Sequence, residues 1–301
     1  MTRPVVGFVG VGLMGWGMAK NIVEKGYGLR VIAHRKREAV DDLVKRGAVE
    51  VTSLKEMGEA CSVVVLCVTG SPEVEATVAG LLEGAQAGLT IIDTSTSRPD
   101  VTERLAAALA KKGMTFIDAP LSRTPKHAWD GELTTYVGGS DELIDQVKPL
   151  LSTWASVIIP IGGPVGSAHA VKLINNLIGI GYAAIWSEAY SMIRKIGIKP
   201  QVLRGVVSNS GMNCGNFQNY SKFICEGDPD AHQFAMANCL KDLTYFNELA
   251  NRHGAATLMS DGALQVLKLG ATLGMGPRNI GEMSDVYAAL NGQPLGPVLN
   301  D

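Results

Sequence analysis

The stretch Val5-Val6-Gly7-Phe8-Val9-Gly10-Val11-Gly12-Leu13-Met14-Gly15 decides the fold of this chain. Its first five residues are apolar and largely β-branched and predict a strand, and a helical pattern follows that ends near Gly26. A strand, a glycine turn and a helix in this order are the context that a dinucleotide fingerprint requires. There the first glycine permits a tight turn, the second lets the backbone approach a pyrophosphate, and the third lets the helix pack on the strand. Because the helix N-terminus also offers N–H groups to phosphate, we expect a dinucleotide to bind Gly10, Gly12, Leu13, Met14 and Gly15.

The second predicted strand, Leu29–Ala33, indicates which dinucleotide is bound. A site that prefers NAD usually ends this strand on an acidic residue, whose carboxylate accepts a hydrogen bond from the ribose 2′-hydroxyl. Here four basic residues follow instead, His34-Arg35-Lys36-Arg37. Basic side chains at this corner would bind a 2′-phosphate, so we expect NADP, with NAD as the alternative, and place His34, Arg35 and Lys36 in the cofactor site. The other interpretation is a solvated basic start to the next helix.

A second informative stretch, Val165–Asn176, combines an amine and two amides in a largely apolar segment. On a helix, Lys172, Asn175 and Asn176 stand at i, i+3 and i+4 and therefore share one face. An amine beside uncharged donors in a partly dry cleft can exchange protons with a hydroxyl or carbonyl group near neutral pH. The alternative is a solvated lysine on an amphipathic helix. The dinucleotide fingerprint favours the catalytic interpretation.

Composition narrows the class of protein. A chain of 301 residues can form two domains with substantial cores. A formal net charge of −2 argues against a general affinity for nucleic acid or anionic membranes. The five cysteines lack a paired spacing and indicate reduced thiols, neither a zinc site nor a disulfide framework. No signal peptide precedes the first strand and no apolar run is long enough to span a bilayer, so we expect a cytoplasmic protein. We also expect that it needs no metal, because Lys172 can supply both a positive charge and a proton.

Strand-like and helical segments alternate up to about Ile159 and predict a mainly parallel, doubly wound sheet of the Rossmann type. The predicted strands are Val5–Val9, Leu29–Ala33, Ser62–Val68, Thr90–Asp93, Thr115–Asp118, Thr134–Val137 and Val157–Pro160. After Gly162-Gly163-Pro164 only helical segments follow, beginning with a long one to about Ile196. We therefore predict an α/β chain with a Rossmann domain over residues 1–163 and an all-helical domain over residues 164–301. The long apolar helix predicts a homodimer or homotetramer.

Polar loops follow three of the predicted strands, and in open α/β sheets the ligand lies outside the carboxyl ends of the strands. The first contains Val68 and Thr69, the second Thr96, and the third Ser122, Arg123 and Thr124. We expect the first two loops to line the cofactor and the third to line the substrate. For each loop the alternative is the ordinary use of Ser and Thr in turns.

Together these features resemble the β-hydroxyacid dehydrogenase family over nearly the whole chain. The likeness rests on four blocks: the glycine loop with Met18-Ala19-Lys20-Asn21, then Asp118-Ala119-Pro120, then Lys172 with Asn175-Asn176, and finally Lys241-Asp242-Leu243. The resemblance implies that Lys172 is the catalytic proton donor and acceptor and that Asn176 helps to position the substrate. It also implies that Thr96 lies near the nicotinamide and that Lys241 borders the cofactor site.

The chain departs from the family pattern at two positions. Arg123 stands where the family usually has the first glycine of a Ser-Gly-Gly loop, and Ala168 replaces a glycine before the lysine. A guanidinium can engage a carboxylate or sulfonate through two parallel charge-assisted bonds, and this loop resembles that of sulfolactaldehyde reductases. We expect a small anionic substrate, a β-hydroxy acid or its semialdehyde, with a sulfonate as the alternative. The structural alternative is that Arg123 pairs internally, with Asp118 or Asp130.

The function that we expect is reversible hydride transfer between NADP(H) and this substrate, with Lys172 as general acid and base. A catalytically silent dinucleotide-binding protein is the alternative of another class, but it would not need Lys172 and would be expected to carry a basic tail or reader domain. An imine reductase usually has Asp or Tyr at the lysine position. Lys172 therefore disfavours both.

Overall fold

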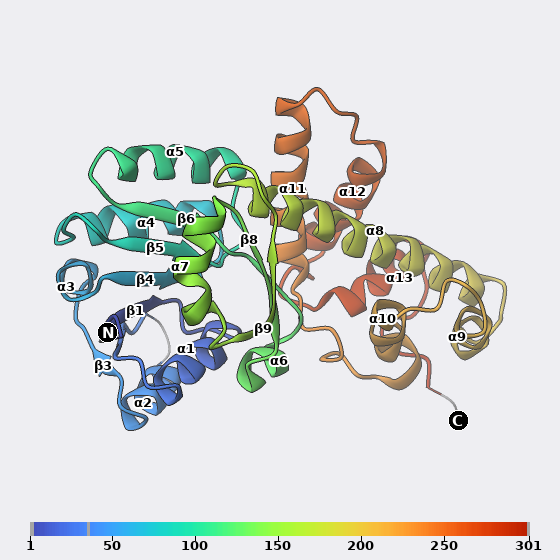
Figure 1. The fold of residues 1–301 in the computed structure, drawn as a ribbon. Helices are drawn as coiled ribbons and strands as arrows, with labels where there is room; N and C mark the ends of the chain where they lie inside the picture. Colours follow the sequence, from blue (N-terminus) through green and yellow to red (C-terminus); the bar gives the residue numbers. More distant parts are fainter. Residues whose placement is uncertain (1–2, 35–36, 300–301) are drawn as a thin grey trace. The chain divides into compact units, whose positions relative to one another are not determined.

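The computed structural model describes residues 3–34 and 37–299 (Figure 1). The chain divides into two compact units, Met1–Lys172 and Leu173–Asp301. The first unit holds the strands and the second consists of helices, which confirms the predicted α/β class with a Rossmann-type domain followed by a helical one. The boundary suggested by the sequence, after residue 163, lies just before the long helix within which this division falls.

A six-stranded parallel sheet with the order β3-β2-β1-β4-β5-β6 forms the centre of the first unit. The six strands are short: β1 Val6–Val9, β2 Leu29–Val31, β3 Val49–Glu50, β4 Val63–Leu66, β5 Thr90–Asp93 and β6 Thr115–Asp118. The order reverses direction between β1 and β4, and in doubly wound sheets this switch point is where a dinucleotide binds.

Helices cover both faces of this sheet (Figure 1). On one face, α1 (Gly15–Glu24) and α2 (Glu38–Lys45) pack against a buried cluster that includes Phe8 and Val65. On the other face, α4 (Ser71–Leu82), α5 (Pro99–Ala110) and the shorter α3 (Leu54–Ala60) pack against a cluster that includes Val64 and Leu66. Successive strand residues point to opposite faces, so the continuous apolar run of β4 serves both clusters and marks the strand as central.

The last predicted strands do not extend the main sheet, contrary to the single sheet that the alternating pattern predicts. Instead β7 (Leu121–Ser122), β8 (Leu133–Val137) and β9 (Ala155–Pro160) form a separate sheet in which β7 and β8 are antiparallel. The hairpin between them contains α6 (Pro125–Asp130), and α7 (Asp141–Leu151) connects β8 to β9. A strand of two residues such as β3 or β7 is too short to show a period, which is why neither was predicted.

The second unit contains helices and no named strand among its described residues. After α8 (Ser167–Lys195), which begins in the first unit, come α9 (Pro200–Ser208), α10 (Gly215–Glu226), α11 (Met236–Arg252), α12 (Leu258–Thr272), the 3-10 helix Ile280–Met283 and α13 (Ser284–Leu290). Their core is built around the buried side chains of Tyr190, Phe217 and Tyr220. Within the ranges that the structure describes, no helix is both long enough and apolar enough to cross a membrane.

Candidate active site

The three glycines of the turn after β1 differ in how much space surrounds them. Gly10 has a φ of 100°, and a Cβ there would lie 2.2 Å from the carbonyl oxygen of Cys67. A Cβ on Gly15 would lie 2.0 Å from the carbonyl oxygen of Gly10. A Cβ on Gly12, in contrast, would meet no heavy atom within 4 Å. Gly10 and Gly15 are therefore required for the turn and the helix packing, whereas Gly12 leaves open space beside the backbone.

The N-terminus of α1 is suited to an anionic ligand. Its N-cap residue, Met14, makes no side-chain hydrogen bond to the first turn, so no cap from that residue competes for the N–H groups that a phosphate would use. Leu13 beside it is 72% exposed. The open space at Gly12 and this helix end together fit the pyrophosphate of a dinucleotide.

The loops that follow the neighbouring strands β1, β4 and β5 lie at one edge of the sheet, because parallel strands end at the same edge. Val68 and Thr69 follow β4, and Thr96 follows β5. The backbone N–H of Val68 donates to the hydroxyl of Ser95 at 3.0 Å, so the two loops are tied together. The structure thus brings the glycine turn and both predicted cofactor loops to the switch point of the sheet.

The four basic residues after β2 are His34, Arg35, Lys36 and Arg37. His34 is exposed, and Arg35 and Lys36 lie outside the described residues. Arg37 donates hydrogen bonds to Glu50 and Asp41, and these bonds raise the pKa of its guanidinium above the usual value. Arg37 is therefore engaged with two carboxylates.

The predicted substrate loop has an unusual backbone. Arg123 has a φ of 85°, the one positive φ outside glycine among the described residues, and this conformation favours glycine over a residue with a Cβ. Its guanidinium donates to the carbonyl oxygen of Glu132 at 2.9 Å, across the β7–β8 hairpin. Ser122 ends β7, and the hydroxyl of Thr124 lies 2.7 Å from Nδ1 of His127.

Neither internal partner suggested for Arg123 is the one that the structure shows. Asp130 pairs with Lys126, and both carboxylate oxygens of Asp118 accept backbone N–H groups, as described below. The structural alternative for Arg123, a pairing with Asp118 or Asp130, does not occur in that form, because these carboxylates bind Lys126 and backbone N–H groups. The internal contact of Arg123 is made to a backbone carbonyl instead.

Asp118 holds the N-terminus of α8. Its buried carboxylate accepts the N–H groups of Gly166 and His169, each at 2.9 Å. A carboxylate at this end of a helix satisfies unpaired N–H groups and complements the helix dipole. The ring of His169 is fully buried, with Nδ1 2.8 Å from the hydroxyl of Thr102 on α5. The first turn of α8 is thereby attached to β6 and α5, and Lys172 stands one turn further along.

Asn21 connects α1 to the helix after the substrate loop. Its buried amide nitrogen donates to the carbonyl oxygens of Ala128 and Trp129 in α6 and of Gly17 in its own helix. A Cβ on Gly17 would lie 2.5 Å from the backbone nitrogen of Trp129, so the two helices are in close contact. Sequence reasoning placed Asn21 in a motif but did not find this role, which depends on residues more than a hundred positions away.

In the second unit, Asn176 and Lys241 both contact Asp242, which the sequence places in a motif but to which it assigns no role. The amide nitrogen of Asn176 on α8 donates to Oδ2 of Asp242 on α11 at 2.7 Å. The ammonium of Lys241 lies 2.7 Å from Oδ1 of the same carboxylate and 4.9 Å from the ring centroid of Tyr245. Asn175, next to Asn176, is exposed. The helix confirms the expected spacing of Lys172, Asn175 and Asn176 along α8.

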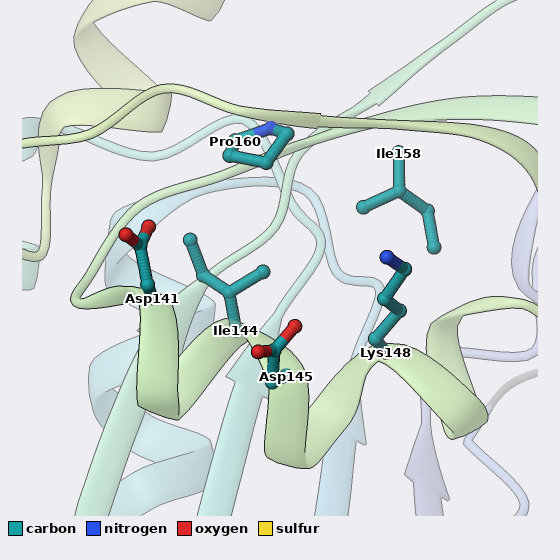
Figure 2. Close-up of a pocket in the computed structure, with 6 residues that line it drawn as sticks. All are labelled: Asp141, Ile144, Asp145, Lys148, Ile158 and Pro160. Carbon is teal, nitrogen blue, oxygen red and sulfur yellow. The ribbon is translucent and has the colours of Figure 1, made fainter.

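Two surface grooves contain none of the predicted site residues. One, of about 310 Å³, lies between α7 and β9 and is lined by Asp141, Ile144, Asp145, Lys148, Ile158 and Pro160 (Figure 2). The other, of about 200 Å³, is lined by Leu177 and Phe246 together with residues 256–260. Among the described residues, no cluster of three or more His, Cys, Asp or Glu side chains is arranged to hold a metal ion.

Comparison with known proteins adds an independent line of evidence. A family model described as the NAD binding domain of 6-phosphogluconate dehydrogenase matches residues 5–163. A second model, described as NAD-binding of NADP-dependent 3-hydroxyisobutyrate dehydrogenase, matches residues 166–287. The two matches meet close to the start of α8.

Two relatives and one solved structure cover most of the chain. The chain is 30% identical to 2-(hydroxymethyl)glutarate dehydrogenase of Eubacterium barkeri, over 95% of this chain and 96% of the relative. It is 30% identical to 3-sulfolactaldehyde reductase of Escherichia coli, over 82% and 83% of the two chains. The crystal structure of 3-hydroxyisobutyrate dehydrogenase from Salmonella typhimurium superposes with a TM-score of 0.84 at 25% identity, over 94% of this chain and 99% of that one.

Proposed function

The chain belongs to the β-hydroxyacid dehydrogenase family of NAD(P)-dependent oxidoreductases, and from this premise we propose that it transfers a hydride reversibly between NADP(H) and a small anionic β-hydroxy acid or its semialdehyde. The observation that carries the proposal is the position of Lys172 on α8. It stands one turn beyond a helix start that Asp118 and His169 hold in place through buried contacts. A proton-transferring amine needs such fixed placement, since misplacement by about 1 Å can cost a hundredfold in rate.

The residues of the chain divide the chemistry between them. The nicotinamide, when bound, accepts or gives the hydride. In the oxidation direction Lys172, as a neutral amine, takes the proton of the substrate hydroxyl. In the reduction direction the same residue, as an ammonium, stabilises and protonates the developing alkoxide. Because Lys172 supplies both the charge and the proton, the reaction needs no metal.

We assign residues 1–163 to dinucleotide binding, with Ser122, Arg123 and Thr124 also serving the substrate, and the remaining helical region to substrate binding and assembly, with Lys241 also serving the cofactor. The pyrophosphate is held by Gly10, Gly12, Leu13, Met14 and Gly15, supported by the open space at Gly12 and the helix end beside it. Val68, Thr69 and Thr96 line the nicotinamide half, and Lys241 borders it. His34, Arg35 and Lys36 bind the 2′-phosphate, and the absence of an acidic residue after β2 favours NADP over NAD.

The substrate is held by Ser122, Arg123, Thr124, Asn175 and Asn176. Its acid group meets Arg123, whose planar guanidinium suits bidentate recognition of a carboxylate or sulfonate. The relatives support an anionic substrate, since their names specify a glutarate and a sulfolactaldehyde. The second candidate is a sulfonate substrate, and the observation that favours it is the 30% identity to 3-sulfolactaldehyde reductase over 82% of this chain.

The assembly that we propose is a homodimer or homotetramer formed through α8. The helix carries exposed apolar side chains at spacings of three, four and seven residues, which places them along one stripe; they are Ile174, Ile178, Tyr182, Ile185 and Met192. A stripe of this kind on a monomer is typical of a protein interface. A cytoplasmic location stays a prediction.

The test combines a substrate screen with one substitution. The unmodified protein is assayed with NADP and NAD against small hydroxy acids and hydroxysulfonates. Lys172→Ala should lower turnover of the best substrate by at least ~10²-fold and leave NADPH affinity, measured by fluorescence titration, nearly unchanged. Lys148→Ala, in the groove beside α7 (Figure 2), is the matched control and should retain full turnover.

Two outcomes would contradict the proposal. Near-normal turnover of Lys172→Ala would exclude the assigned mechanism. Tight NADPH binding without turnover of any hydroxy acid or hydroxysulfonate by the unmodified protein would favour a silent dinucleotide-binding protein, and turnover of cyclic imines alone would favour an imine reductase.

A further inference from the structure

Asp242 is a buried carboxylate whose two oxygens face two different predicted site residues. Its side chain is 3% exposed. Oδ2 accepts a hydrogen bond from the amide nitrogen of Asn176 at 2.7 Å. Oδ1 forms an ion pair with the ammonium of Lys241 at 2.7 Å. One residue on α11 therefore links a predicted substrate residue on α8 to a predicted cofactor residue.

We propose that Asp242 is a positioning residue of the hydride-transfer site, which fixes the amide orientation of Asn176 and the place of the Lys241 ammonium. The inference rests on the proposed function, because it assigns Asp242 a role in that reaction. Asp242 itself touches neither reactant in this assignment and acts through its two neighbours.

The chemistry of the contact determines which way the Asn176 amide points. An ionised carboxylate only accepts hydrogen bonds, so the group that faces Asp242 must be the NH₂ of Asn176 and not its carbonyl. The Oδ1 of Asn176 is then directed away from Asp242 as an acceptor. Asn176 stands one turn after Lys172 on α8, so we infer that Asn176 serves the reaction as an acceptor, for the substrate hydroxyl or for the Lys172 ammonium. A reversed amide would present an N–H donor there, which could not accept a hydrogen bond from the substrate hydroxyl and would repel the Lys172 ammonium.

Burial makes this arrangement specific. Counted over whole residues, Asn176 is 8% exposed and Asp242 is 2% exposed. A hydrogen bond to a charged group is also shorter and stronger than one between neutral groups. A buried carboxylate that loses a partner is destabilised by its lost solvation. Asp242 therefore favours one orientation of the Asn176 amide and keeps the Lys241 ammonium close to its own carboxylate.

The first experiment is a double-mutant cycle. Asp242→Asn keeps the side-chain shape but lets either orientation of the Asn176 amide form a hydrogen bond, and it removes the partner charge of Lys241. We expect kcat/KM for the substrate to fall by about tenfold to a hundredfold, the usual effect of losing a charged hydrogen bond. In the Asn176→Ala background the same substitution should cost less, because the part of its effect that acts through Asn176 is already lost and only the part through Lys241 remains. Equal losses in both backgrounds would overturn the positioning of Asn176 by Asp242.

Asp261→Asn is the matched control. Asp261 on α12 also accepts a hydrogen bond from an asparagine amide, that of Asn247 at 2.7 Å, but this pair is exposed and lies outside the predicted site residues. The kcat/KM of the Asp261→Asn variant should stay within about twofold of that of the unmodified protein, because an exposed pair contributes little. A loss as large as that of Asp242→Asn would show a general structural effect and would overturn the inference.

A second measurement does not depend on activity or on the stability of a variant. In the unmodified protein without substrate, NMR should show the side-chain NH₂ of Asn176 protected from hydrogen exchange relative to the exposed NH₂ of Asn209. Exchange as fast as that of Asn209 would overturn the contact on which the inference rests. Protection in a protein that turns over no hydroxy acid would instead count against the proposed function, so the two failures can be distinguished.

Discussion

Arg123 combines a recognition side chain with a backbone conformation that suits glycine. A left-handed conformation costs an L-residue ~1–2 kcal/mol, and such strain is often found at functional positions. If Arg123 binds the acid group of the substrate, Arg123→Ala should raise KM for an anionic substrate by roughly tenfold or more and hardly affect an uncharged aldehyde. Arg123→Lys should not restore full activity, because an ammonium lacks the planar fork. Steady-state kinetics on both substrate classes checks this, and equal losses on both would reject the role.

The strain at Arg123 can be measured separately from its binding role. Arg123→Gly and Arg123→Ala both remove the guanidinium and its bond to Glu132, but only glycine adopts a φ of 85° without a steric penalty. We expect the glycine variant to be more stable than the alanine variant by about 1 kcal/mol in chemical denaturation. The reverse order would show that the loop relaxes to another conformation.

The basic residues after β2 predict that the protein prefers NADPH to NADH. Arg35→Ala should weaken NADPH binding by ~1.5–3 kcal/mol, the usual contribution of a hydrogen bond to a charged group, and barely affect NADH. Arg37→Ala is the control, since the Arg37 guanidinium already binds Glu50 and Asp41. Fluorescence titration with both cofactors checks the prediction. Equal affinity of the unmodified protein for NADH and NADPH would contradict it.

The turn between β1 and α1 allows fold and function to be separated at the scale of one element. Gly12→Ala adds a methyl group in open space, so the melting temperature should change little while cofactor affinity falls, because the methyl group stands where the pyrophosphate approaches. Gly15→Ala places the methyl group 2.0 Å from the Gly10 carbonyl oxygen, and α1 must shift. We expect it to cost ~1–3 kcal/mol of folding stability, as overpacking does. Thermal melts and NADPH titrations of both variants check this, and equal melting temperatures would contradict it.

The long helix α8 shows how one element serves two purposes. Its first turn is held by Asp118 and His169, so the position of Lys172 depends on buried contacts and not on the intrinsic stability of the helix. Further along, its exposed apolar stripe is available for assembly. Tertiary packing rather than propensity stabilises most helices in proteins, and α8 follows this rule at its start.

At the scale of the whole molecule, the α8 stripe predicts self-association. Ile185 is 52% exposed near the middle of the stripe, and Ile185→Asp would bury a charge in an interface. We expect the unmodified protein to sediment as a dimer or tetramer and Ile185→Asp to shift it toward the monomer. Val44→Asp, at a comparably exposed apolar position on α2, should leave the assembly unchanged. A monomeric unmodified protein in sedimentation equilibrium would refute the prediction.

Sequence reasoning predicted what depends on local pattern. All the predicted strands occur, and the helical second region and the long helix from Ser167 occur as expected. Gly10 and Gly15 have the tight surroundings that the fingerprint requires. These features could be predicted because apolar periodicity and the placement of glycine act between residues close in the chain.

By itself, then, the sequence determined the class of fold, the glycine turn and the order of the elements. Only the tertiary structure decided that β7, β8 and β9 form their own sheet, that Asp118 holds a helix start 48 residues away, and that Asp242 accepts a hydrogen bond from Asn176 across 66 residues. The residues next to an aspartate in the sequence do not indicate which distant N–H group its carboxylate will bind. Such pairs form because burial penalises every polar group that stays unpaired, and burial is a property of the folded molecule.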